Sequence, residues 1–254
     1  MNKTVIKTLI AAWASMCAVG VHGADSISVK SPIVNRIGVD LRSGWAPPTN
    51  SYIRGENHLR QSITTTSAIH FRYDMSFTDA TRWGRLFPGA YQGIGIGINT
   101  FYKKDLLGCP TSLYVYQGAP IVHFSRRLWL GYEWNFGASF GWKKYDKDEN
   151  EQNLVIGSSV NAYINVSFLL HYRLTSRWQL VGGVEGAHYS NGNTSWPNAG
   201  VNSVGARIGV SYLMGGGNDS YSKNKPVSDE ELEQYDAPAW NYDVVAYGAV
   251  RKRV

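Results

Sequence analysis

RLWLGYEWNFGASFGW, from Arg127 to Trp142, alternates almost without a break between two kinds of side chain. Its even-numbered positions, beginning at Leu128, are apolar or aromatic, whereas its odd-numbered positions are mostly glycine, polar or charged, as at Glu133 and Asn135. A period of two indicates a β-strand with one apolar and one polar face. Strands of soluble β-sandwiches are usually about five or six residues long, so this length favours a barrel that crosses a lipid bilayer.

The same alternation recurs along the chain, and its repetition carries more weight than any one segment. Apolar and polar residues alternate again over 160–173 and 69–75, and isoleucines alternate with glycines over 93–98. The sequence therefore predicts an all-β fold, an antiparallel transmembrane barrel of about eight strands. The strands are expected near residues 33–42, 66–75, 90–101, 112–122, 127–142, 159–173, 177–190 and 201–213.

The connections between these strands alternate in length. Residues 43–65, 143–158 and 191–200 have the composition of loops, whereas His123 to Arg126 and Thr175-Ser176 are tight turns. Outer-membrane barrels have short periplasmic turns and longer external loops, so the long connections are expected to face outward. The second connection, 76–89, is longer than this scheme requires.

The ends of the chain are expected to lie outside the barrel. Lys3 and Lys7 precede the apolar run Leu9 to Val21, which is typical of a secretory signal peptide cleaved near Gly23. We therefore expect a signal peptide at 1–23, an outer-membrane barrel at 24–214 and a C-terminal extension at 215–254. The extension begins as a polar linker, and its residues 240–254 resemble another strand, which leaves open a tail or a longer barrel.

Composition excludes several classes of function. Beyond the N-terminus no run of eighteen apolar residues exists, so no transmembrane helix is expected in the mature chain. The formal charge of +6 comes without a basic helix or a lysine cluster, so nucleic acid is not expected as a partner. Removal of Cys17 with the signal peptide would leave Cys109 alone, without a disulfide within the chain. The oligomeric state is left open.

Polar side chains capable of chemistry gather around the seventh connection, in His188-Tyr-Ser-Asn-Gly-Asn193 and Pro197-Asn-Ala-Gly-Val-Asn202. His188 and Ser190 lie two apart on one strand and so share a face, which parity places on the apolar, lipid-facing side. Hairpin pairing symmetrical about Ser195 would place His188 opposite Asn202. At the external end of the strands the three polar groups would lie at the level of the lipid headgroups, where their exposure costs less.

This arrangement suggests an acyl-ester hydrolase. Ser190 would attack the ester, His188 would accept its proton, and Asn202 would hold the imidazole in the required tautomer. Backbone N–H groups in the loop, with Gly192 and the amides of Asn191 or Asn198, would stabilise the oxyanion. The same residues are also good turn formers. No metal-ligand cluster with zinc spacing is present, and no cofactor is expected.

The remaining aromatic and charged residues have expected structural roles. Tyr132, Trp134 and Trp142 are expected in the girdle at the membrane interface. Glu185 has the wrong parity to join the imidazole and should point into the lumen. A polar network in the lumen is expected from His70, His171, Glu133, Glu185 and Arg207.

The motifs around His188 and Asn202 resemble those of the outer-membrane lipid A 3-O-deacylase family, in particular Bacteroidetes-type members labelled acyloxyacyl hydrolases. The likeness covers about residues 33–213 and includes Arg54-Gly-Glu-Asn57, Gly93–Gly97, Tyr114–Pro120 and Gly157–Asn165. It implies an eight-stranded barrel in the outer membrane of a Gram-negative bacterium that removes an ester-linked acyl chain from the lipid A of lipopolysaccharide. His188 and Ser190 match the His-x-Ser pair of that family, and Asn198 matches an asparagine near its oxyanion.

One position departs from the family pattern, because Asn202 stands where a glutamate is expected. Outer-membrane phospholipase A is also similar, and it combines His-x-Ser with a downstream asparagine. Two alternatives to a metal-independent lipid A deacylase therefore remain. One is a phospholipase, a branch linked to calcium, and the other is a non-catalytic structural or pore-forming barrel.

Overall fold

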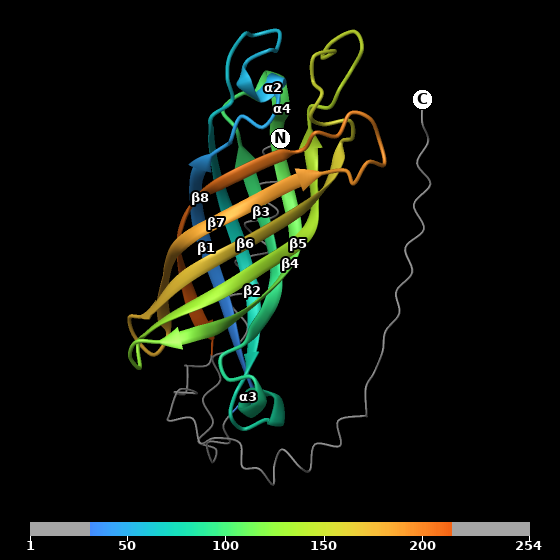
Figure 1. Ribbon diagram of the computed structural model, residues 1–254. Helices are drawn as coiled ribbons and strands as arrows, with labels where there is room; N and C mark the ends of the chain where they lie inside the picture. The colour runs from blue at the N-terminus through green and yellow to red at the C-terminus, as the bar shows by residue number, and fades with distance from the viewer. Residues whose placement is uncertain (1–30, 215–254) are drawn as a thin grey trace, which may run out of the picture. The chain divides into compact units, whose positions relative to one another are not determined.

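A computed structural model describes residues 31–214, which form a closed barrel of eight antiparallel strands (Figure 1). Each strand pairs with the next one in sequence, and the last pairs with the first, from Asn35–Met214 to Trp45–Val204. The strands are β1 Ile33–Trp45, β2 Thr65–Phe77, β3 Tyr91–Thr100, β4 Gly108–His123, β5 Leu128–Trp142, β6 Val160–Arg173, β7 Trp178–Ser190 and β8 Val201–Met214. The predicted eight-stranded antiparallel barrel is confirmed. The expected signal peptide and C-terminal extension lie outside the described residues.

Long connections gather at one end of the barrel, which we call the loop end. These are residues 46–64, 101–107, 143–159 and 191–200, and they include the short helices α2 Ser51–Arg54 and α4 Lys104–Leu107. The other end, the turn end, has tight connections at 124–127 and 174–177 (Figure 1). None of the helices within residues 31–214 has the length and apolar character needed to cross a membrane.

The connection between β2 and β3 is the exception at the turn end. It contains the helix α3 Arg82–Leu86, whose first turn is capped by the Thr81 side chain, with Oγ1 accepting a hydrogen bond of 3.0 Å from the Gly84 N–H. A threonine in this position satisfies a backbone donor that a helix otherwise leaves free. The excess length seen in the sequence is therefore a short capped helix.

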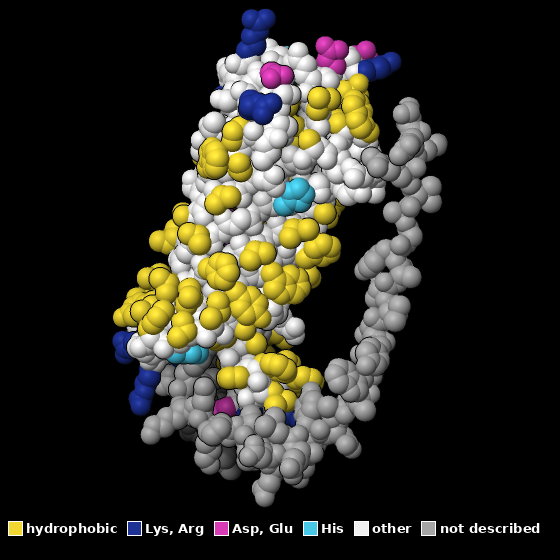
Figure 2. All heavy atoms as spheres, in the orientation of Figure 1, with side chains coloured by type: hydrophobic (Ala, Val, Ile, Leu, Met, Phe, Trp, Pro, Cys, Tyr) yellow, Lys and Arg dark blue, Asp and Glu magenta, His cyan; other side chains and the backbone are white. Residues whose placement is uncertain are grey.

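The outer wall of the barrel is apolar. Outward side chains such as Ile94, Phe136 and Val184 are more than half exposed, at 56%, 54% and 59%. Figure 2 shows hydrophobic side chains spread over the visible wall, while charged ones cluster toward the ends of the barrel. Because side chains alternate across each strand, this exposed apolar face is the face that lipid covers.

The lumen is filled by ion pairs. Glu133 lies 2.8 Å from Arg72 and 2.6 Å from Arg207, and Asp40 lies 2.9 Å from each of the same two arginines. Further pairs join Arg42 with Glu185 at 3.0 Å and Arg36 with Asp74. His70 bonds Tyr114 and His171 bonds Gln179, at 2.8 and 2.7 Å. The polar lumen network predicted from parity is confirmed.

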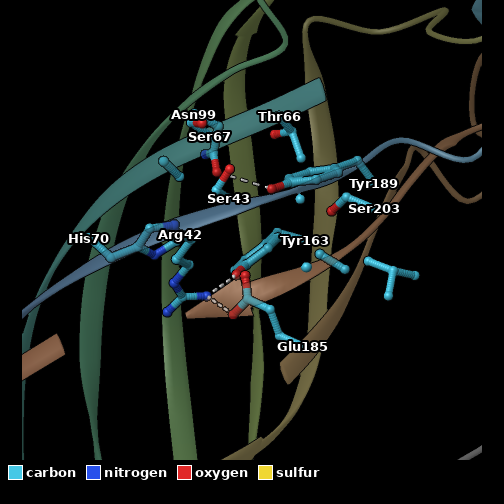
Figure 3. A pocket seen from close by; sticks show the side chains of 15 residues that line it. Arg42, Ser43, Thr66, Ser67, His70, Asn99, Tyr163, Glu185, Tyr189 and Ser203 are labelled. Carbon is cyan, nitrogen blue, oxygen red and sulfur yellow. Dashed lines mark hydrogen bonds and ion pairs between the residues drawn. The ribbon is translucent and has the colours of Figure 1, made fainter. Parts of the chain in front are cut away.

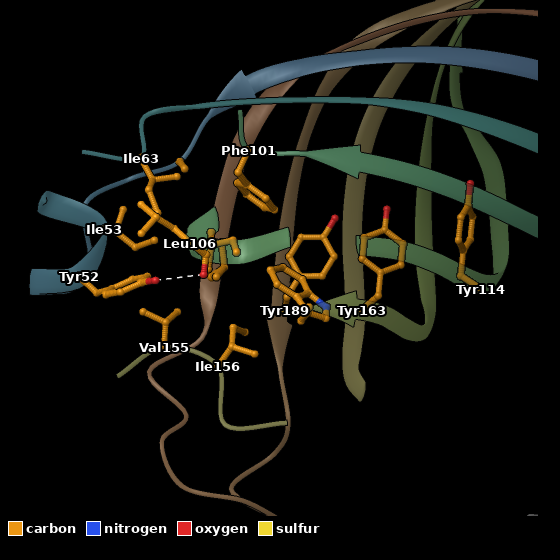
Figure 4. Close-up of a cluster of buried hydrophobic side chains, with 14 of the residues drawn as sticks. Tyr52, Ile53, Ile63, Phe101, Leu106, Tyr114, Val155, Ile156, Tyr163 and Tyr189 are labelled. Carbon is orange, nitrogen blue, oxygen red and sulfur yellow. Dashed lines mark hydrogen bonds between the residues drawn. The ribbon is translucent and has the colours of Figure 1, made fainter. Parts of the chain in front are cut away.

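The loops at the loop end fold over the barrel and have a core of their own (Figure 4). The Tyr52 hydroxyl lies 3.0 Å from both the Leu106 carbonyl oxygen and Asn150 Oδ1, which ties α2 to α4 and to the 143–159 loop. We call this buried cluster the loop core, and its members are Tyr52, Ile53, Ile63, Phe101, Leu106, Leu107, Trp142, Val155 and Ile156. It closes the barrel from the loop end.

The position of Trp142 corrects an expectation. Its side chain is only 5% exposed and belongs to the loop core, whereas the alternation of β5 placed it in the interfacial girdle beside Trp134, which is 41% exposed. Gly141 has a φ of +85°, a backbone conformation that other residues rarely adopt. This residue breaks the alternation, so that Trp142 turns inward and donates a hydrogen bond of 2.8 Å from Nε1 to Ser139 Oγ.

Candidate active site

Ion pairs and aromatic side chains of the described residues fill much of the interior of the barrel. Beneath the loop core lies a cavity of about 20 Å³, lined by residues that include Arg42, His70, Tyr163 and Glu185 (Figure 3). Arg42 crosses it, donating to the Tyr163 hydroxyl at 3.2 Å and to Glu185 at 3.0 Å. A volume of this size holds about one water molecule. This cavity is too small for an acyl chain, so we expect the site predicted from the sequence on the outer wall.

His188, Ser190 and Asn202 lie on that outer wall, at the loop end of β7 and β8. The residues between them in sequence point the other way, since Tyr189 is 4% and Val201 1% exposed. Along β7 the apolar outward side chains end at Val184, and the polar ones begin at His188. The predicted outward parity of all three residues is confirmed, and it places them at the border between the apolar wall and the polar loops.

The register of the β7–β8 hairpin brings the imidazole and the amide together. His188 pairs directly with Asn202, as expected from symmetry about Ser195, and its Nδ1 lies 2.7 Å from Asn202 Oδ1. An amide oxygen only accepts hydrogen bonds, so the neutral ring must carry its proton on Nδ1. The other nitrogen, Nε2, is then left with the lone pair that a general base needs.

Ser190 shares the outward face with His188, one strand repeat further toward the loop. On β6 the partner of His188 is Ile164 and that of Ser190 is Ala162, so a small side chain lies next to the hydroxyl. Within the described structure no hydrogen bond joins the Ser190 hydroxyl to the His188 ring. Hydrogen bonds between catalytic groups are often long or poorly aligned without substrate and tighten only in the complex.

The loop that follows Ser190 is held by asparagines. Asn191 Nδ2 donates to the carbonyl oxygens of Ser195 at 2.8 Å and Pro197 at 3.5 Å, and the Asn191 N–H donates to Asn198 Oδ1 at 2.8 Å. The donors of Asn191 are thus occupied in holding the loop. Asn198 Nδ2 donates one hydrogen to Asn193 Oδ1 at 3.2 Å, and its second hydrogen has no partner among the described residues. The backbone N–H of Gly192 also has no partner among them.

Glu185 does not complete this site. It points into the lumen and pairs with Arg42, as its parity predicted. No group of three or more histidine, cysteine, aspartate or glutamate side chains in the described part of the chain could hold a metal ion. The expectation of a metal-independent reaction stays a prediction.

Sequence reasoning missed how the neighbouring loop supports the site. Residues 154–157 of the β5–β6 connection bond to the 191–200 loop, through Leu154 O to the Ala199 N–H at 3.3 Å and Val155 O to the Gly200 N–H at 3.1 Å. These bonds join backbone groups far apart in the chain and leave no trace in residue type. The glycine and asparagine content of both loops was the only available signal.

A lipid-facing barrel with an imidazole, a hydroxyl and an amide on its outer wall has the form of an outer-membrane acyl-ester hydrolase. The sequence comparison gives the family, because a sequence model of the lipid A 3-O-deacylase (PagL) family matches residues 66–211, more than half of the chain. The chain belongs to this family. It is an outer-membrane lipid A deacylase of a Gram-negative bacterium. The match does not separate Bacteroidetes-type members from others, so that narrower expectation stays a prediction.

Solved structures of several outer-membrane barrels are similar to the chain at low identity. The outer membrane enzyme PagL is 16% identical with a TM-score of 0.40, over 68% of this chain and 97% of that one. Neisserial surface protein A is 11% identical with a TM-score of 0.40, over 71% and 95%. The N-terminal β-barrel domain of Pseudomonas aeruginosa OprF is 10% identical with a TM-score of 0.41, over 72% and 98%. No curated protein matches the sequence.

Proposed function

We propose that the chain removes an ester-linked acyl chain from lipid A with Ser190 as nucleophile, His188 as general base and Asn202 as the residue that orients His188. The observation that carries this proposal is the bond of 2.7 Å between His188 Nδ1 and Asn202 Oδ1 on the lipid-facing wall. It fixes the tautomer that leaves Nε2 free on the same face as Ser190.

The reaction follows from these positions. Ser190 Oγ attacks the ester carbonyl carbon while its proton moves to His188 Nε2. The tetrahedral intermediate then expels the sugar oxygen, which takes the proton from Nε2. Water then gives a proton to the same nitrogen and attacks the carbonyl carbon of the acyl-Ser190 ester. The bond to Ser190 Oγ breaks, Oγ takes the proton back from Nε2, and the fatty acid leaves. The oxyanion is stabilised by the N–H of Gly192 and the free hydrogen of Asn198 Nδ2, while Asn191 keeps the loop in shape.

The test is loss of an acyl chain from lipopolysaccharide incubated with the purified protein, followed by mass spectrometry of the lipid. We expect Ser190→Ala and His188→Ala to lower the rate by about 10²-fold or more, since general base catalysis alone contributes about 10²- to 10⁴-fold. Ser203→Ala is the matched control, because Ser203 lies next to Asn202 but lines the cavity inside the barrel. Equal rates for wild type and Ser190→Ala would refute the assignment.

Asn202 also favours a second candidate, a phospholipase, since an asparagine in the third position is typical of outer-membrane phospholipase A. Release of fatty acid from phosphatidylethanolamine, measured with and without calcium, separates the two. The family match leads us to expect little release from the phospholipid in either condition. Faster, calcium-dependent release from the phospholipid than from lipid A would favour the second candidate.

A further inference from the structure

The His188 ring has a second support besides Asn202. A Cβ atom on Gly200 would lie 2.9 Å from His188 Cε1 and 3.6 Å from Nε2, so the ring lies directly against the Gly200 backbone. Gly200 has a φ of +72°, which also favours glycine at this position. Movement of Gly200 would therefore move the imidazole.

Gly200 is in turn fixed to the neighbouring loop. Its N–H donates to Val155 O at 3.1 Å, and Ser195 Oγ donates to Gly157 O at 3.0 Å. Gly157 packs so closely on the loop that an added Cβ would lie 2.6 Å from the Trp196 carbonyl carbon and would collide with the Pro197 carbonyl oxygen. We call residues 153–157 the supporting segment.

The supporting segment is anchored in the loop core. Val155 and Ile156 are completely buried there, beside Tyr52 and Leu106 (Figure 4). Asn153 Oδ1 accepts hydrogen bonds of 3.1 Å from the N–H groups of both residues. The Ile156 carbonyl oxygen accepts one of 2.7 Å from the Tyr145 N–H. A continuous set of contacts therefore leads from the packed loops to the imidazole on the outer wall.

We infer that the supporting segment positions His188 for the reaction, with Gly157 and Gly200 as the positioning residues. This inference rests on the proposed function, because it assigns a role to groups that hold the general base. The folded loops then do more than close the barrel. They fix where Nε2 lies relative to Ser190, and a misplacement of about 1 Å at such a site can cost about 10²-fold in rate.

Two variants test whether the supporting segment positions His188. Gly157→Ala forces the supporting segment away from Pro197, and we expect kcat on lipopolysaccharide to fall by about 10- to 100-fold with KM near that of wild type. Ser195→Ala removes only the hydroxyl that bonds Gly157, and we expect kcat to fall by about two- to tenfold, the equivalent of one hydrogen bond. Gly182→Ala is the matched control, since its Cβ would meet nothing closer than 3.8 Å on the same wall.

A spectroscopic readout separates positioning from general damage. In ¹⁵N-labelled protein in detergent micelles, the His188 Nδ1–H signal, identified by its loss in His188→Gln, reports the bond to Asn202. We expect it to shift or disappear in Gly157→Ala and to stay unchanged in Gly182→Ala. If Gly157→Ala does not fold, the kcat and the His188 Nδ1–H signal of Ser195→Ala test the positioning role.

The outcomes distinguish this inference from the proposed function. Folded Gly157→Ala and Ser195→Ala proteins with the wild-type kcat and the wild-type His188 signal would overturn the positioning role, whatever Ser190→Ala does. A shifted signal in Gly157→Ala together with full activity in Ser190→Ala would support the link to His188 and overturn the proposed function instead.

Discussion

At the scale of single residues, the third member of the site decides what the imidazole can do. The amide oxygen of Asn202 fixes the same tautomer that a carboxylate would fix, through a bond of 2.7 Å. It brings no negative charge to stabilise the imidazolium that the proposed attack by Ser190 would form. In a serine protease an asparagine in this position costs about 10⁴-fold, because it selects the wrong tautomer. Here the amide oxygen faces Nδ1, so that loss does not apply.

We therefore expect Asn202→Ala to lower kcat by about 10- to 150-fold, the equivalent of a lost hydrogen bond to a group that becomes charged, about 1.5–3 kcal/mol. Asn202→Glu should keep at least the wild-type rate, since its carboxylate accepts the same bond and adds a charge opposite the imidazolium. Initial rates of acyl release from lipopolysaccharide measure both effects. A glutamate variant as slow as the alanine variant would show that the site needs the amide itself.

At the scale of elements, the loop core depends on a buried hydroxyl. Tyr52 lies between Leu106 O and Asn150 Oδ1, and burial raises the pKa of its phenol to about 12. Because this folded-state value lies above the unfolded one, the group stabilises the fold fully below about pH 10 and loses its effect as the pH rises toward 12. Stability between pH 6 and 9 should therefore not depend on Tyr52 ionisation.

Tyr52→Phe should lower the free energy of unfolding by about 1–2 kcal/mol, because it removes the one buried hydroxyl hydrogen that the Leu106 carbonyl oxygen and Asn150 Oδ1 share. Urea unfolding in detergent micelles, followed by tryptophan fluorescence, measures the loss. Tyr102→Phe is the control, since Tyr102 is 61% exposed although its hydroxyl also bonds a side chain, Ser67, at 2.8 Å. An equal loss in both variants would mean that the loop core has no special dependence on this hydroxyl.

The elements also show where sequence reasoning succeeds and where it stops. Period-two alternation predicted the strand positions and the lumen-facing residues, because side-chain direction along a strand is a local property. The His188–Asn202 register followed from hairpin symmetry about Ser195, since the loop between the two strands is short. The alternation failed at Trp142, where the positive φ of Gly141 reverses it, and it gave no account of the loop core or the supporting segment. Those depend on contacts between loops distant in sequence, which no local pattern encodes.

At the scale of the whole molecule, a filled lumen argues against a pore. Ion pairs close the middle of the barrel, and the loop core closes one end, with a cavity of about 20 Å³ between them. We expect the purified protein to show no steady conductance in planar bilayers at moderate voltage. A stable open channel would mean that the lumen network and the loops rearrange together, and it would favour the pore-forming alternative.

The buried lumen network and the proposed site lie on opposite faces of the barrel wall, so we expect substitutions in the lumen to change stability more than activity. Glu133 is completely buried between Arg72 and Arg207, so Glu133→Gln leaves two arginines short of a counter-charge and should cost about 3–5 kcal/mol of unfolding free energy. Glu185→Gln, at the edge of the network with one partner, should cost less. Folded Glu133→Gln should keep nearly the wild-type kcat, whereas Ser190→Ala should lose activity and keep its stability. Urea unfolding measures the loss of stability, and acyl-release assays on the same preparations measure activity. A Glu133→Gln enzyme that is stable but inactive would contradict the expectation that the lumen network mainly affects stability.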